Sequence, residues 1–267
     1  MSTVFNLGTA LITGASTGIG AIYARRLAQR GYDLILVARD QRRLADLATE
    51  ISANTGRKAE TLAADLTAKA DLKRVEDRLR SDSNITALVN NAGFGAVAKL
   101  IDSNIDEMDN MIQLNVTALT RLTSAALPSF LNRSKGLIIN VASVVALNPE
   151  LLNGVYSGTK AFVVNLTQSL HNEVNDKGVR VQAVLPGATR TEFWDRANLP
   201  VHHLADEIVM SSEEMVDAAL AGLEQGEVIT IPALPDLADW SNFEAARKAL
   251  GPNLSHKHAA SRYGVHA

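Results

Sequence analysis

The sequence predicts an α/β fold in which a doubly wound parallel sheet carries helices on both faces. Up to about residue 190, short apolar runs alternate with longer segments in which apolar residues recur every three or four positions. Several of the short runs are apolar on both faces, which is typical of strands that helices cover from both sides. The resulting βαβαβ order requires a parallel sheet, because each strand must be reached through a crossover helix.

The elements follow in order from these patterns. The apolar runs predict strands at TALIT (9–13), DLILVA (33–38), LVN (88–90), GLIINVAS (136–143), RVQAVLP (180–186) and VITIP (228–232). The helical periodicity predicts helices over 18–31, 40–56, 69–81, 105–132, 156–178, 211–226 and 239–251. Ser211 and Glu214 have the spacing of a capping box at the start of one of these helices.

Composition excludes several classes of protein. The chain of 267 residues has no cysteine, which excludes disulfides, Cys-ligated zinc and thiol catalysis. It has 26 Lys and Arg against 29 Asp and Glu, a net charge of -3, so there is no basic excess for nucleic acid. No basic residue precedes Arg25, and the apolar runs are too short to span a bilayer. We therefore expect a soluble, cytoplasmic protein with neither nucleic acid nor membrane as a partner.

A glycine-rich turn, TGASTGIG (13–20), follows the first predicted strand and opens the first predicted helix. Its glycines, Gly14, Gly18 and Gly20, allow a tight turn and the close approach of a pyrophosphate to the N–H groups of the helix. The spacing departs from G-x-G-x-x-G, because three residues separate the first two glycines. The turn predicts a bound nucleotide, and the alternative is a tight connection without a ligand.

The end of the second predicted strand bears on which dinucleotide binds. Arg39 lies 19 residues after Gly20, where an acidic residue would hold the 2'-hydroxyl of NAD(H) and an arginine the 2'-phosphate of NADP(H). A guanidinium group suits the phosphate, which favours NADP(H) over NAD(H). Two alternatives remain: Arg39 is a solvated loop residue, or Asp40 takes the ribose hydroxyl if the strand ends one residue later.

Tyr156 and Lys160 lie four residues apart in NGVYSGTKAF (153–162). A helix places two such side chains on one face, with Cβ atoms about 5–6 Å apart. Taken alone, such a pair is explained by a tyrosine ring that packs on a neighbour's aliphatic stem more often than by catalysis.

Several motifs together indicate a family. TGASTGIG, AADLT (63–67), NNAG (90–93), Asn115, Ser143, Tyr156 with Lys160, and PGATRT (186–191) resemble, in order and spacing, the classical short-chain dehydrogenases/reductases over roughly residues 8–192. The resemblance implies a single Rossmann-type domain over 1–267, a bound NAD(P)(H), and hydride transfer between the nicotinamide and a carbonyl or alcohol. It also implies a substrate lid at about 190–212 and a C-terminal extension at about 233–267.

The resemblance carries roles onto particular residues. Ser143, Tyr156 and Lys160 would be catalytic, and Asn115 would hold a water in a proton relay behind the lysine. Asp65 would contact the adenine, and Asn90, Ala92 and Gly93 would line the adenosine side. The implied cofactor-binding residues are Gly14, Ser16, Thr17, Gly18, Ile19, Gly20, Arg39, Asp65, Leu66, Asn91, Ala92, Gly93, Tyr156, Lys160, Pro186, Gly187, Thr189 and Thr191. Without the family pattern, Asn115 reads as a helix residue that satisfies a backbone group and Ser143 as a strand-end cap.

The chemistry explains why a lysine would accompany the tyrosine. Carbonyl reduction needs an acid within hydrogen-bonding reach of the oxygen, and free tyrosine has a pKa of about 10. A positive charge about 5 Å away contributes roughly 3 kcal/mol at an effective dielectric constant of about 20, or between two and three pKa units. We therefore expect Lys160 to bring the pKa of Tyr156 to between 7 and 8, and Ser143 to donate a second hydrogen bond to the substrate oxygen.

The substrate side is predicted only by position. An apolar wall is expected from Phe94, Val145, Leu147, Leu152, Phe193 and Trp194, although Phe193 and Trp194 equally suit packing of the lid onto the core. His202 and His203 are adjacent and point apart in an extended chain, so we expect no metal site. By analogy with the family, the chain forms a homodimer or homotetramer through the helices that hold Asn115 and Tyr156.

Three functions are compatible with these residues. The leading one is an NADP(H)-dependent reductase or dehydrogenase that acts on a small-molecule carbonyl or alcohol. The second is a dinucleotide-sensing protein without chemistry, which would not need Ser143, Tyr156 and Lys160 together. The third is an epimerase or dehydratase that uses the same site, which would form product without net consumption of cofactor.

Overall fold

The computed structural model describes residues 7–197 and 199–265. The chain divides into two compact units, Met1–Pro232 and Ala233–Ala267. The prediction of one domain over the whole chain stays a prediction. The first unit carries the sheet and the residues of the predicted site.

The first unit is built on one seven-stranded sheet with the strand order β3-β2-β1-β4-β5-β6-β7. All of its strand pairs are parallel. The order reverses between β1 and β4, and in open sheets of this kind ligands bind beyond the carboxyl ends of the strands at that point. The strands are β1 (Thr9–Thr13), β2 (Asp33–Ala38), β3 (Ala59–Ala63), β4 (Ile85–Asn90), β5 (Gly136–Val141), β6 (Val179–Val184) and β7 (Ile229–Thr230).

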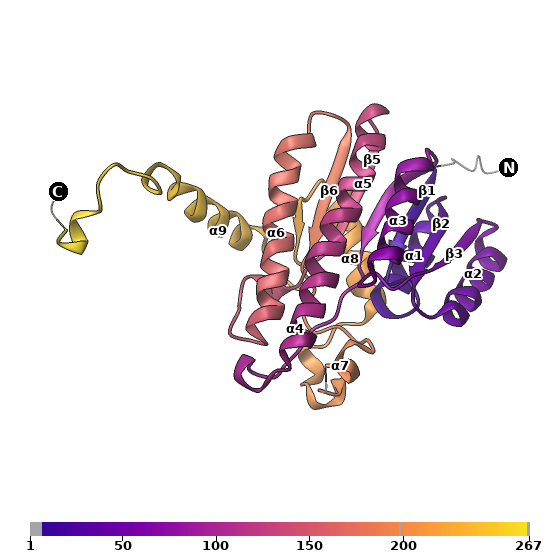
Figure 1. The fold of residues 1–267 in the computed structure, drawn as a ribbon, viewed down its shortest axis with the longest axis horizontal. Coiled ribbons are helices and arrows are strands. Elements are labelled where there is room, and N and C mark those ends of the chain that lie inside the picture. Colours follow the sequence, from indigo (N-terminus) through magenta and orange to yellow (C-terminus); the bar gives the residue numbers. More distant parts are fainter. Residues whose placement is uncertain (1–6, 198, 266–267) are drawn as a thin grey trace. The chain divides into compact units, whose positions relative to one another are not determined.

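Helices cover both faces of this sheet, as predicted. Alternate residues of β1 divide between two apolar cores: Ala10 and Ile12 pack with α1, α2 and α8, and Leu11 packs with α3, α5 and α6. Figure 1 shows α3, α5 and α6 side by side over one face. The helices of this unit are α1 (Gly18–Gln29), α2 (Gln41–Thr55), α3 (Lys69–Ser81), α4 (Ile105–Ile112), α5 (Leu119–Asn132), α6 (Gly154–Val174), α7 (Phe193–Arg196) and α8 (Ser212–Glu224).

Two elements differ from the predictions. Strand β3 was not predicted, because at the edge of the sheet its side chains are only partly buried and lack the two-sided apolar pattern. The single helix expected over 105–132 is interrupted by a π-helical turn, Gln113–Ala118, between α4 and α5. Such turns add a residue to the helical repeat without changing the apolar period enough to be seen in the sequence.

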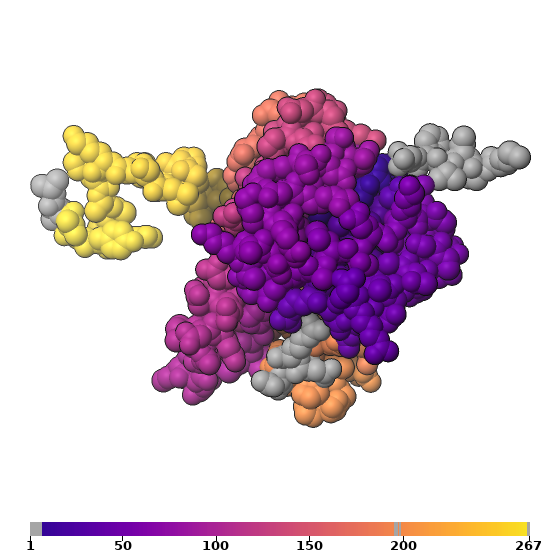
Figure 2. Space-filling view, turned by 45° about the vertical axis from the view of Figure 1, so that its right-hand side comes forward, coloured from indigo at the N-terminus to yellow at the C-terminus, as the bar shows by residue number. Residues whose placement is uncertain are grey.

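The predicted lid segment at 190–212 contains α7 and two short 3₁₀ turns, Val201–His203 and Asp206–Ile208. A parallel bridge between Thr189 and Met210 joins its two ends. In Figure 2 the segment (orange) borders the N-terminal elements (indigo to violet). The expectation for the histidines was wrong in its geometry, because a 3₁₀ turn brings the rings of His202 and His203 to 4.4 Å between centroids.

The second unit contains α9 (Leu237–Ala249), which corresponds to the helix predicted over 239–251. Asp236 caps this helix by accepting a hydrogen bond from the Ala238 N–H group at 2.8 Å. The rings of Trp240 and Phe243 stack within the helix at 5.4 Å between centroids.

Two features are absent from the described residues. None of the described helices combines the length and apolar character that a membrane span requires. Within the same part of the chain, no three His, Cys, Asp or Glu side chains come together in a group that could hold a metal ion.

Candidate active site

The glycine-rich turn between β1 and α1 has the shape that an anionic group requires. Gly14 and Gly18 adopt φ angles of +65° and +53°, which side chains rarely adopt. A Cβ atom on Gly20 would lie 2.3 Å from the carbonyl oxygen of Gly14, so the turn closes only with glycine there. Thr17 precedes α1 without a side-chain cap, and no acidic residue occupies the first turn of the helix. The turn therefore presents helix N–H groups and a partial positive charge, which fits a pyrophosphate.

A clamp that the sequence analysis missed holds this turn against the end of β4. The Thr13 hydroxyl accepts hydrogen bonds from the N–H groups of Asn91 and Ala92, both at 3.0 Å. The Asn91 amide donates to the carbonyl oxygens of Thr13 at 3.0 Å and Gly14 at 3.1 Å. Asn91, expected as a cofactor ligand, thus has its amide engaged in shaping the turn. The signal was present in the sequence, since Thr13 opens the glycine-rich motif.

Asn90 was expected to line the adenosine side of the cofactor site. Its side chain points instead toward α5 and β5. It is buried and donates to Thr123 Oγ1 at 3.0 Å and to Asn140 Oδ1 at 2.9 Å. Asn140 continues the chain to Thr167 at 2.9 Å. This buried polar row links β4 and β5 to α5 and α6, so the Asn90 side chain supports the sheet beneath the site.

The carboxyl ends of β2 and β3 bring the predicted adenosine-binding residues together. Strand β2 ends at Ala38, and the exposed Arg39 follows it directly. Asp40 caps α2 by accepting from the Arg43 N–H group at 3.0 Å, which speaks against the alternative that it takes the ribose hydroxyl. Asp65 accepts two hydrogen bonds from Thr67, at 3.0 Å and 2.7 Å. Burial acts to raise the pKa of Asp65, but these bonds and the charge of Arg39 lower it overall.

Ser143, Tyr156 and Lys160 come together beyond the carboxyl end of β5. Ser143 lies two residues after the strand, where its hydroxyl accepts from the Val145 N–H group at 3.3 Å and reaches the Pro186 carbonyl at 3.4 Å. Tyr156 and Lys160 lie on the first turns of α6, and both are buried. Lys160 Nζ donates to the Val141 carbonyl at 2.9 Å and lies 5.8 Å from the centroid of the Tyr156 ring.

The electrostatics of this cluster correct one prediction. Burial raises the pKa of Tyr156 to about 12, and the hydrogen bond with Ser143 opposes that shift. Burial also lowers the pKa of Lys160 to about 8. The expected lowering of the Tyr156 pKa to between 7 and 8 is therefore wrong for this structure, because loss of hydration disfavours the buried phenolate more than the neighbouring groups stabilise it.

Asn115 lies in the π-helical turn, with its side chain fully buried. Its amide accepts from the Phe94 N–H group at 3.1 Å and donates to the Phe94 carbonyl at 2.9 Å. It also donates to Thr159 Oγ1 at 3.1 Å. A Cβ atom on Gly93 would lie 2.9 Å from Asn115 Oδ1. These contacts match the structural role that the sequence left open for Asn115, and the proton relay stays a prediction.

An apolar cluster surrounds the Tyr156 ring. Of the predicted wall, Val145, Phe94, Leu152 and Phe193 belong to it, with Met108, Met111, Ala96 and Val155 as members that the sequence analysis missed. Phe193 packs on Tyr156 with ring centroids 5.7 Å apart. A Cβ atom on Gly95 would lie 2.6 Å from the Phe193 ring, so only glycine leaves room for this contact. Leu147 is exposed, and Trp194 instead anchors the lid by donating to the Thr189 carbonyl at 2.8 Å.

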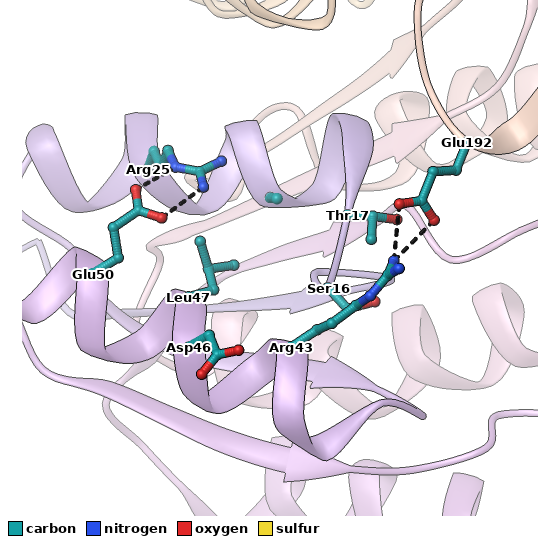
Figure 3. A pocket seen from close by; sticks show the side chains of 9 residues that line it. Ser16, Thr17, Arg25, Arg43, Asp46, Leu47, Glu50 and Glu192 are labelled. Atoms are coloured by element: carbon teal, nitrogen blue, oxygen red, sulfur yellow. Dashed lines mark hydrogen bonds and ion pairs between the residues drawn. The ribbon is translucent and has the colours of Figure 1, made fainter.

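The predicted PGATRT segment lies against the glycine-rich turn. Thr191 Cγ2 would be 3.1 Å from a Cβ atom on Gly18. Next to this contact, a cleft of about 310 Å³ opens between α1 and α2. Figure 3 shows Ser16 and Thr17 of the turn on its wall, with two ion pairs, Arg25–Glu50 and Arg43–Glu192, across it.

Comparison with known proteins agrees with this geometry. The family model described as short chain dehydrogenase matches residues 8–201. The chain belongs to this family. An uncharacterized oxidoreductase of Staphylococcus epidermidis is 37% identical over 210 residues, which cover 75% of this chain and 88% of that protein. The chain is accordingly an oxidoreductase of the short-chain dehydrogenase family, and the predicted family and fold class are confirmed.

Two solved structures are similar over almost the whole chain. A short-chain dehydrogenase from Sphingobium yanoikuyae in complex with NADPH is 47% identical, with a TM-score of 0.93, covering 96% of this chain and 99% of that one. A bulky-bulky ketone specific alcohol dehydrogenase from Comamonas testosteroni is 44% identical, with a TM-score of 0.89, covering 97% and 99%.

Proposed function

We propose that this chain is an NADP(H)-dependent oxidoreductase that transfers hydride between the nicotinamide and a ketone or secondary alcohol. The observation that carries the proposal is the buried cluster of Ser143, Tyr156 and Lys160 at the carboxyl edge of the sheet, where a phosphate-binding turn also opens. The turn fits the cofactor's pyrophosphate, because α1 begins there with no side-chain cap and no acidic residue in its first turn.

Residues of both halves of the sheet would hold the cofactor. Gly14 to Gly20 would bind the pyrophosphate, Asp65 and Leu66 the adenine side, and Gly187, Thr189 and Thr191 the nicotinamide end. Arg39 supports NADP(H), since it directly follows β2 while Asp40 is engaged as a helix cap. The complex of the Sphingobium protein with NADPH supports the same choice.

The reaction follows from the positions of three side chains. When bound, NADPH supplies the hydride that reaches the carbonyl carbon. Tyr156 gives its phenolic proton to the substrate oxygen, which becomes the hydroxyl of the alcohol. Ser143 donates a hydrogen bond to the same oxygen while negative charge develops there. Lys160, with a pKa of about 8, carries its charge at pH 7 and stabilises the phenolate that Tyr156 leaves behind.

The apolar cluster favours a ketone with large apolar substituents. Phe94, Val145, Leu152 and Phe193 belong to the same apolar cluster as Tyr156, and Met108 and Met111 add adaptable side chains to it. The specificity of the Comamonas enzyme for bulky-bulky ketones supports this choice of substrate. We also propose, from family analogy alone, a cytoplasmic homodimer or homotetramer.

The test is oxidation of NADPH, and separately of NADH, by purified protein over a panel of aldehydes, aliphatic ketones and aryl ketones. We expect turnover of bulky ketones with NADPH, and its loss in Tyr156→Phe. Tight NADPH binding without turnover of any substrate would point to the sensing function, and product formed without loss of NADPH to an epimerase or dehydratase.

A further inference from the structure

Two ion pairs on the wall of the cleft in Figure 3 differ in geometry. Arg25 and Glu50 form two parallel hydrogen bonds, Nε to Oε1 at 2.7 Å and Nη2 to Oε2 at 2.8 Å, which tie α1 to α2. Arg43 reaches both Glu192 oxygens with the single nitrogen Nη1, at 2.9 Å each. The first pair uses the forked geometry in which guanidinium and carboxylate bind best, and the second does not.

The second pair borders the proposed phosphate site. Arg43 lies on the first turn of α2, four residues beyond Arg39, and its cleft is also lined by Ser16 and Thr17 of the glycine-rich turn. Glu192 follows Thr191, which packs over Gly18 of the same turn. A carboxylate and a guanidinium therefore stand together beside the place where the cofactor's phosphate groups are expected.

The charges around Arg43 favour replacement of its partner Glu192 by a phosphate group. The side chains of Arg43 and Glu192 are 47% and 45% exposed, and ion pairs at such exposure hold weakly. Arg43 also has Asp40 at 3.6 Å, so its positive charge faces two carboxylates. A phosphate group carries more charge than one carboxylate and accepts both arms of a guanidinium group. A carboxylate beside a phosphate is unfavourable, so Glu192 weakens phosphate binding while it holds Arg43.

We propose that Arg43 is a second cation for the 2'-phosphate of NADP(H), and that Glu192 competes with this phosphate for it. The pair thereby sets how strongly the protein prefers NADP(H) over NAD(H). This inference rests on the proposed function, because it requires that the protein bind these dinucleotides. It adds to Arg39 a residue from α2 and one from the lid, 149 positions apart in sequence.

The test compares dissociation constants of the full chain for NADP⁺, NAD⁺ and adenosine 2',5'-bisphosphate, measured by isothermal titration calorimetry. Glu192→Gln removes the charge of one of the two carboxylates that face Arg43, so NADP⁺ and the bisphosphate should bind about three- to tenfold more tightly, with NAD⁺ changed less than twofold. Arg43→Gln should weaken NADP⁺ and the bisphosphate by a similar factor. Glu50→Gln is the matched control in the same cleft, and it should leave the NADP⁺ to NAD⁺ ratio unchanged.

The possible results distinguish failure of the Arg43–Glu192 proposal from failure of the proposed NADP(H)-dependent function. If Glu192→Gln weakens both dinucleotides alike, the pair only holds the lid to α2 and the competition is disproved. An unchanged ratio in both Glu192→Gln and Arg43→Gln also disproves it, while the proposed function stands. If the wild-type protein binds neither dinucleotide, both the proposed function and this inference are disproved.

Discussion

The buried residues of the proposed catalytic cluster and the exposed residues beside the proposed phosphate site, Arg39, Arg43 and Glu192 (here called the rim), hold their polar side chains in opposite ways. In the cluster, Lys160 and Asn115 are buried and bonded to backbone carbonyl groups, Lys160 to Val141 and Asn115 to Phe94. On the rim, Arg43 and Glu192 are half exposed and bonded to each other. A buried polar group that loses its partner is strongly destabilised, whereas exposed ion pairs exchange readily.

This difference suits two tasks. Proton transfer needs groups that stay within hydrogen-bonding distance of the reacting oxygen, which buried groups with backbone partners can do. Choice between two dinucleotides that differ by one phosphate needs charges that can change partners. Substitutions in the cluster should therefore change turnover and stability, and substitutions on the rim should change only relative affinities.

The largest expected effect is that of Tyr156→Phe. The substitution removes the proton donor and keeps the ring that packs on Phe193, so turnover should fall by about 10²- to 10⁴-fold while the dissociation constant of NADPH changes little. Steady-state kinetics and calorimetry check both values. Tyr32→Phe makes the same change between α1 and β2 and should behave as the wild type. Turnover retained in Tyr156→Phe would refute the mechanism.

A second large effect is expected on stability from Asn115→Ala. It leaves the N–H and carbonyl groups of Phe94 without their amide partner, which should lower the free energy of unfolding by about 2 kcal/mol. Urea denaturation measures this loss. Asn110→Ala, the same change on the exposed face of α4, is the control. Equal free energies of unfolding of the two variants would show that the hydrogen bonds of the buried Asn115 amide do not stabilise the fold.

The sequence was most informative where local pattern and local chemistry coincide. The glycine-rich turn, the strands buried on both faces and the start of α8 at Ser211 all depend on neighbours in the chain, and the structure contains them. Of the predicted capping box, the structure shows the bond in which Ser211 accepts from the Glu214 N–H group at 3.1 Å. Ser143 and Tyr156 were paired only through family resemblance, because the segment after β5 and helix α6 meet only through the fold.

The features that were missed depend on contacts between distant segments or on small changes of helical period. The pair Arg43–Glu192 joins residues 149 positions apart, and no local pattern marks it. The edge strand β3 is half exposed, so it lacks the apolar run of a central strand. The pKa of Tyr156 was predicted from one charge, but burial of the phenol, which only the structure reveals, has the larger effect.

Burial of Lys160 should appear in the pH dependence of stability. Burial lowers the pKa of Lys160 from its ordinary value of 10.5 to about 8, so between these values the unfolded chain binds more protons and stability rises with pH. The gain from pH 8 to pH 9.5 should be about 1.5 kcal/mol and absent in Lys160→Met. Tyr156, whose raised pKa acts in the opposite direction, matters only above about pH 10. A parallel pH profile of wild type and Lys160→Met would disprove the shift.

The smallest expected effect is that of Arg39→Ala, which should change cofactor affinity without changing proton transfer. Arg39→Ala removes the guanidinium group that follows β2, so the dissociation constant of NADPH should rise about tenfold and that of NADH less than twofold. Arg42→Ala removes a second exposed arginine, within α2, and should change neither value. Equal losses for both dinucleotides in Arg39→Ala would remove the argument for NADP(H). If Arg39→Ala shifts only the ratio of affinities and Tyr156→Phe shifts only turnover, then cofactor choice and proton transfer are divided between exposed and buried groups of the same sheet edge.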